Sequence, residues 1–196
     1  ISMLFIFQFI NIILSRVEGP EAVTQYNIAY KYFNVLNMVF VIVLTPFWSA
    51  FTDAYVKKDY NWMSGIVKKL EFLWLLCIPI LILMVLCSNF FYQWWVGNSV
   101  SISFSLSICM AVFMFFYTSA NLYMILINGT SMVCLQLIIN VCFAIISLPC
   151  ICLFCRLWGV QGALLIPTVT LAVLTLIGKI QIMKIVNNRA TGIWQR

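Results

Sequence analysis

Long apolar runs with almost no charged residue inside them restrict this chain more than any other feature of its sequence. No charged residue lies between Glu71 and Arg156, and charged residues make up only 8% of the 196 residues, against 64% hydrophobic ones. In a soluble domain about a quarter of all residues are charged, and these residues cover the surface. The composition therefore excludes a soluble enzyme, a nucleic-acid-binding domain and a disordered chain. It indicates an integral membrane protein.

The apolar runs are long and continuous, which is typical of membrane-spanning helices and not of the short alternating strands of a β-barrel. The sequence therefore predicts an all-α polytopic membrane protein, a bundle of six transmembrane helices. The first run is short for a full crossing and starts at Ile1, so we expect the chain to be the later part of a longer protein. Gly159 and Gly162 predict a tight turn between the last two spans. The expected spans are residues 1–15, 25–51, 70–91, 102–127, 132–154 and 162–183.

The distribution of basic residues predicts the orientation. With six crossings, both termini and the charged loop expected at 53–69 lie on one side, together with most of the Lys and Arg residues: Lys57, Lys58, Lys68, Lys69, Lys179, Lys184, Arg189 and Arg196. The other side holds Arg16 and Arg156. Cytoplasmic loops carry an excess of basic residues, so both termini are expected in the cytoplasm. The tryptophans agree, because Trp94, Trp95 and Trp158 fall at one boundary and Trp48, Trp62, Trp74 and Trp194 at or beyond the other.

The second span carries a polar stripe. At about 100° per residue, its polar side chains gather within a sector of about 120° along the helix: Asn27, Tyr30, Lys31, Asn34, Asn37, Thr45, Ser49 and Thr52. Such groups are costly in hydrocarbon, so this face should meet water or polar protein. Two interpretations stay open, a hydrated cavity and hydrogen bonding between helices. Lys31 also has the alternative of reaching up to the interface.

Other sequence features favour a structural role. Pro46 lies beside the stripe and is a possible hinge, although a fixed bend is the commoner outcome. Cys150, Cys152 and Cys155 form a C-x-C-x-x-C run, but they lie in an apolar stretch of a chain without histidine, so we expect no metal site and no cofactor. The five acidic residues are expected in loops or at helix ends, and no catalytic motif is present. We expect no enzyme activity.

Several segments resemble one known family. Residues 16–33 read RVEGPEAVTQYNIAYKYF, which is similar to the LGPEAVGxYNxAYK segment of polysaccharide flippases, the Wzx-type O-antigen transporters of the MATE-like superfamily. Shorter similarities are PFWSAFTDAY at 46–55, WWVG at 94–97, ING at 127–129 and WGVQGA at 158–163. The resemblance covers essentially the whole chain, and its motifs are moderately specific.

The resemblance implies a fold and a function. Family members resemble twelve-span proteins with two six-helix lobes around a central cavity, and residues 1–196 would be the C-terminal lobe, with the N-terminal lobe missing. The implied activity is translocation of an undecaprenyl-pyrophosphate-linked oligosaccharide across the bacterial inner membrane, with the bilayer and the missing lobe as further partners and no nucleic acid. A cationic, hydrated lumen suits a pyrophosphate and a sugar. The residues that match cavity positions are Arg16 and Lys31 as cations, and Gln8, Asn11, Asn34 and Asn37 as hydrogen-bonding groups.

Three alternatives remain from the sequence. A multidrug exporter of the same superfamily would normally have a carboxylate inside its spans, which we do not expect here. A membrane-bound glycan polymerase or ligase would need a large outer loop, whereas the outer loops expected here are only a few residues long. A truncated remnant without activity is the third.

Overall fold

The computed structural model describes the backbone of residues 2–97 and 100–195, and the side chains of these residues except 2–8, 193 and 195. The described residues form helices and turns, with no strand among them. The elements are α1 (Ser2–Val17), α2 (Pro20–Val56), α3 (Tyr60–Leu75), α4 (Cys77–Val96), α5 (Phe104–Thr130), α6 (Cys134–Val186) and the short 3₁₀ helix η1 (Gly192–Gln195). The all-α class expected from the apolar runs is confirmed.

Local signals explain where several helices begin. Gly19, at a positive φ of 92°, separates α1 from α2, and Pro20 opens α2 at a position where its missing N–H costs nothing. The Asp59 carboxylate accepts the Trp62 N–H at the start of α3, at 3.1 Å. The Asp59 cap satisfies a backbone N–H group that the helix leaves without an internal partner.

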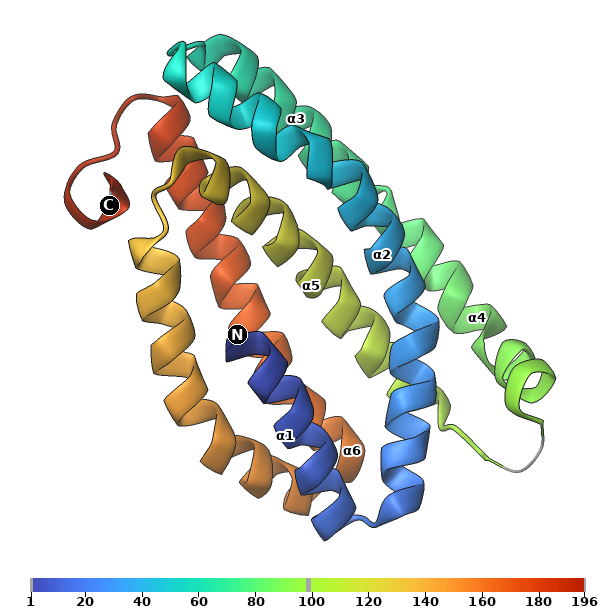
Figure 1. Cartoon of the computed structure of the whole chain (residues 1–196). Helices are drawn as coiled ribbons and strands as arrows, with labels where there is room; N and C mark the ends of the chain where they lie inside the picture. The colour runs from blue at the N-terminus through green and yellow to red at the C-terminus, as the bar shows by residue number, and fades with distance from the viewer. Residues whose placement is uncertain (1, 98–99, 196) are drawn as a thin grey trace.

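The helices run back and forth between two ends of an elongated bundle (Figure 1). One end holds the short turn between α2 and α3, the turn between α5 and α6, and the C-terminal segment. It also carries most of the described basic residues, so we call it the basic end: Lys57, Lys58, Lys68, Lys69, Lys179, Lys184 and Arg189. The opposite end holds the turn between α1 and α2, the end of α4 and the reversal within α6.

One helical segment is longer than the expected span, and another turns back on itself as expected. Leu76 keeps right-handed helical angles (φ −65°, ψ −15°), so α3 and α4 form one nearly continuous helix. In α6 the backbone leaves helical geometry at Trp158 and Gly159, where Gly159 has φ 61°, and the chain turns back on itself. An added Cβ at Gly162 would lie 2.0 Å from the Phe154 carbonyl oxygen, which explains a glycine at this turn. The turn predicted at Gly159 and Gly162 is confirmed.

Among the described residues, four helical stretches are long and apolar enough to cross a membrane: Pro20–Val56, Tyr60–Val96, Phe104–Thr130 and Cys134–Val186. Their outward faces carry many exposed large apolar side chains, such as Ile42, Leu86, Phe90 and Ile145. A water-soluble monomer rarely exposes so much contiguous apolar surface. The chain therefore has the character of a membrane-embedded helical protein, and the division into six crossings stays a prediction.

The prediction of a charged loop at residues 53–69 is wrong. Helix α2 continues to Val56 and α3 begins at Tyr60, so only residues 57–59 form the turn. Charge alone does not end a helix, because Lys and Glu are good helix formers. The expected helix end at Asn128-Gly129 is displaced as well, since α5 continues to Thr130 and Ser131 adopts the left-handed conformation (φ 62°).

Helix α5 lies at the centre of the bundle and packs on α2, α4 and α6, whereas α1 packs mainly on α6. Two glycines permit close helix approaches. An added Cβ at Gly178 of α6 would lie 2.8 Å from the Tyr123 Cβ of α5, and one at Gly129 of α5 would lie 3.1 Å from the Trp48 carbonyl oxygen of α2. Small residues at such crossings let helix backbones pack tightly in a membrane.

Candidate functional site

The first half of the polar stripe on α2 is used for contacts between helices. The Asn27 Nδ2 donates to the Asn11 Oδ1 of α1 at 3.0 Å and to the Val23 carbonyl oxygen at 2.8 Å. This pair joins α1 to α2 near their shared turn. A half-buried amide in an apolar bundle needs such partners, because an unpaired polar group away from water costs free energy.

A second amide cluster joins α2 to the central helix. The buried Asn37 donates through Nδ2 to the Asn34 Oδ1 at 3.2 Å, and its own Oδ1 accepts from the Asn121 Nδ2 of α5 at 2.8 Å. The Asn121 side chain also hydrogen-bonds that of Tyr117, one turn earlier on α5. We call Asn34, Asn37, Asn121 and Tyr117 the amide cluster. Asn121 and Tyr117 were missed from the sequence, because nothing there says which face of α5 meets α2.

The predicted cavity cations lie apart from this cluster. Lys31 is exposed on α2, and Arg16 is exposed at the end of α1, at the opposite end from the basic one. Neither forms an ion pair with a carboxylate of the described part of the chain. Gln8 is the remaining predicted site residue. Its backbone belongs to α1, but its side chain is not among those that the structure describes. Of the predicted set, the structure thus brings together Asn34 and Asn37, and places Asn11 on Asn27.

The second half of the stripe borders an open hollow. The hollow has a volume of about 660 Å³ and lies along exposed residues of α2, namely Thr45, Trp48, Ser49, Thr52, Asp53 and Val56. Each hydroxyl donates to its own helix, to the carbonyl oxygens of Val41, Pro46 and Trp48 respectively, at 2.8–3.2 Å. Their oxygen lone pairs stay available, so the hollow offers hydrogen-bond acceptors beside an apolar helix.

Pro46 lies inside α2, next to this hollow. It has no N–H to donate to the Ile42 carbonyl oxygen, which weakens the helix at this point. Figure 1 shows α2 bent along its length. A bend agrees with both interpretations of Pro46, and its role as a hinge stays a prediction.

A charged cluster at the basic end corrects one expectation from the sequence. Glu71, expected in a loop or at a helix end, lies within α3 with a side chain only 21% exposed. Its Oε1 accepts the Tyr123 hydroxyl of α5 at 2.6 Å and pairs with the Lys179 Nζ of α6 at 3.2 Å. These three residues therefore join three helices by charge-assisted bonds, which are stronger than neutral ones. Their positions, more than fifty residues apart, gave no signal in the sequence.

The described residues show no group of three or more His, Cys, Asp or Glu side chains that could hold a metal ion. The cysteines are free thiols, and in the C-x-C-x-x-C run Cys152 is exposed on α6 whereas Cys155 is buried. The polar chemistry of the described site is therefore that of amides, hydroxyls and exposed cations, which bind by hydrogen bonds and charge.

Comparisons with models of protein families, with curated proteins and with solved structures find no match to this chain.

Proposed function

We propose that the chain is one lobe of a membrane transporter that moves a lipid-linked oligosaccharide, carried on undecaprenyl pyrophosphate, across the bacterial inner membrane for surface polysaccharide synthesis. The observation that carries the proposal is the open polar hollow along α2, where three hydroxyl-bearing residues face outward from a helix long and apolar enough to span a membrane. Polar groups exposed on a membrane-spanning helix more often line the path of a polar solute than face lipid.

The chemistry of the α2 face suits this substrate. Sugars are recognised by amides and hydroxyls, and the exposed Lys31 adds a positive charge on the same helix. A second lobe would face α2 and close the hollow into a cavity. In this interpretation α3–α4 is one crossing and the two arms of α6 are two, which gives the six-helix lobe with both termini at the cytoplasmic side.

The amide cluster supports the proposal by stiffening the helix that carries the hollow. Asn37 and Asn121 hold α2 against α5, so the exposed side of α2 is presented on a fixed backbone. Pre-positioned polar groups lose less conformational freedom when they bind a ligand.

The test is glycan export by the full-length protein with Lys31→Ala, compared with Lys57→Ala. Lys57 is an exposed lysine of the α2–α3 turn, paired with Asp53 at 2.7 Å, and serves as the matched control. We expect Lys31→Ala to reduce the surface glycan and Lys57→Ala to leave it near the wild-type level. Unchanged glycan in both variants, at wild-type protein amounts, would remove Lys31 from the transport path.

A cation-coupled multidrug exporter is the second candidate, and the half-buried Glu71 favours it. Exporters of cationic drugs use a carboxylate within the bundle. Here Lys179 already balances the charge of Glu71, which argues for the flippase. Efflux of a cationic dye from cells separates the two, because an exporter would lose efflux on Glu71→Gln whereas a flippase would show no efflux to lose.

A further inference from the structure

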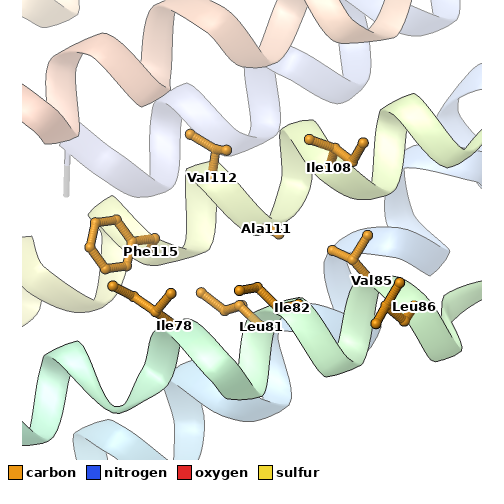
Figure 2. A pocket seen from close by; sticks show the side chains of 9 residues that line it. All are labelled: Ile78, Leu81, Ile82, Val85, Leu86, Ile108, Ala111, Val112 and Phe115. Atoms are coloured by element: carbon orange, nitrogen blue, oxygen red, sulfur yellow. The ribbon is translucent and has the colours of Figure 1, made fainter.

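A narrow apolar groove lies between α4 and α5 on the outer side of the bundle (Figure 2). It has a volume of about 390 Å³ and is lined only by apolar side chains: Ile78, Leu81, Ile82, Val85, Leu86, Ile108, Ala111, Val112 and Phe115. Leu81 and Ala111 form a buried floor, and Ile82 is 56% exposed at the rim. Neither α4 nor α5 contains a charged residue, so the groove opens toward hydrocarbon and not toward water.

The length and the apolar lining of the groove suit a hydrocarbon chain. Along α4 it runs from Ile78 to Leu86, about 12 Å at 1.5 Å per residue. A chain lying along this course would meet only apolar side chains. An unbranched hydrocarbon chain, roughly 4 Å wide at carbon contact distance, fits this space.

The groove covers the inner part of one leaflet of a bilayer and ends just past the midplane. Trp74 and Trp94 lie about 30 Å apart along α3–α4, which equals the hydrocarbon thickness that interfacial tryptophans bound. The Ile78 end then lies about 6 Å below the boundary at the basic end, and the Leu86 end about 3 Å past the midplane. Trp74 borders the upper end, where its ring stacks on Phe115 at a centroid distance of 4.5 Å and its Nε1 donates to the Phe115 carbonyl oxygen at 3.0 Å. The groove is open along its side, where Ile82 is exposed, so a lipid chain can enter beside Trp74.

A lysine lies beyond the upper end of the groove, within reach of the lipid headgroups. Lys68 is exposed on α3, about 9 Å beyond Trp74 and just outside a headgroup layer about 5–8 Å thick, and its long flexible side chain can reach that layer. Because α3 and α4 are nearly continuous, Lys68 lies on the same face as Ile82 and Leu86, to within about 40° at 100° per residue. Lys69 is also exposed, but it is turned away from Leu86 by about 100° and from Ile82 by about 140°.

We propose that the α4–α5 groove and Lys68 form a binding site for one anionic phospholipid of the leaflet at the basic end. One acyl chain lies in the groove, and the phosphate pairs with the Lys68 ammonium group. The inference is independent of the transport proposal, since it rests on the shape, depth and charge of this face alone.

Native mass spectrometry of the purified full chain in mild detergent tests the site, with phosphatidylglycerol or phosphatidylcholine of equal chain length added as the probe. We expect the wild type to retain one phosphatidylglycerol. Ile82→Trp fills the groove, and Ile146→Trp is its control, because Ile146 is also 56% exposed but lies on α6. Ala111→Leu fills the floor of the groove from the α5 side. Both groove variants should lose the lipid, and Ile146→Trp should keep it.

Two further variants test the contact between Lys68 and the lipid headgroup. Lys68→Ala should weaken binding of phosphatidylglycerol about fivefold, the effect of one lysine near an anionic lipid, and Lys69→Ala should not. Four outcomes would overturn the proposal. The first two are that Ile82→Trp and Ala111→Leu keep the lipid, or that Ile146→Trp loses as much lipid as they do. The others are that the wild type binds the two phospholipids equally well, or that it carries a polyprenyl phosphate or a second copy of the chain in place of the phospholipid.

Discussion

The close approach of α5 and α6 at Gly178 gives the sharpest prediction. In Gly178→Ala the new methyl group would lie 2.8 Å from the Tyr123 Cβ and 3.3 Å from its Cγ. Tyr123 is almost fully buried, so either the ring or the helix must move. Overpacking of this kind costs about 1–3 kcal/mol of unfolding free energy. Displacing Tyr123 also lengthens its 2.6 Å hydrogen bond to Glu71.

A matched control removes the effect of helix propensity. Gly65 lies inside α3, is exposed, and an added Cβ there meets no atom within 4 Å. Replacing a helical glycine by alanine stabilises by about 1 kcal/mol in the absence of a clash. Both variants share this gain, so their difference isolates the overpacking. We expect Gly178→Ala to be about 1–3 kcal/mol less stable than Gly65→Ala.

The assay is reversible unfolding in mixed micelles with increasing sodium dodecyl sulfate, followed by far-ultraviolet circular dichroism. Equal midpoints for the two variants would refute the close α5–α6 packing. A further check is Gly178→Ala combined with Glu71→Gln. If the clash acts partly through the Tyr123–Glu71 bond, the combined loss should be smaller than the sum of the two single losses.

Three further predictions follow from the polar contacts. A double-mutant cycle of Asn37→Ala and Asn121→Ala should give a coupling of about 0.6 kcal/mol, the average of hydrogen bonds between membrane helices; a coupling near zero would contradict the bond between α2 and α5. Lys179→Met should lower stability in the same unfolding assay by about 1–3 kcal/mol, because it leaves the half-buried Glu71 carboxylate without its cation. Lys57→Met, which breaks an exposed pair, should cost less than about 1 kcal/mol, and equal losses in the two lysine variants would argue against a special role of the Glu71 cluster.

The sequence predicts the helical class because apolar runs of this length have few other stable forms in a membrane. It also predicts the turn at Gly159, where a positive φ favours glycine. It fails at the 53–69 segment, because the charged residues there extend α2 and α3 instead of forming a loop.

The candidate site is predictable only in part. Periodicity identifies the α2 stripe, because all its members lie on one helix and the geometry of a helix is known in advance. It cannot identify Asn121 or the Glu71–Tyr123–Lys179 cluster, whose members lie on different helices. Which faces meet depends on packing details such as Gly129 and Gly178, which only the folded chain shows.

The packing of α1 on α6 has a consequence for biogenesis. The ribosome releases α1 well before α6, and the turn of α6 at Gly159 must form before its second arm can return along the bundle. Until α6 is synthesised, α1 therefore packs only on α2, to which the Asn27–Asn11 hydrogen bond joins it. Helix α6, on which α1 mainly packs, is the last long helix to be synthesised. A stall in translation before α6 is complete would leave α1 the least secured helix of the nascent chain, and the first segment open to quality-control proteases.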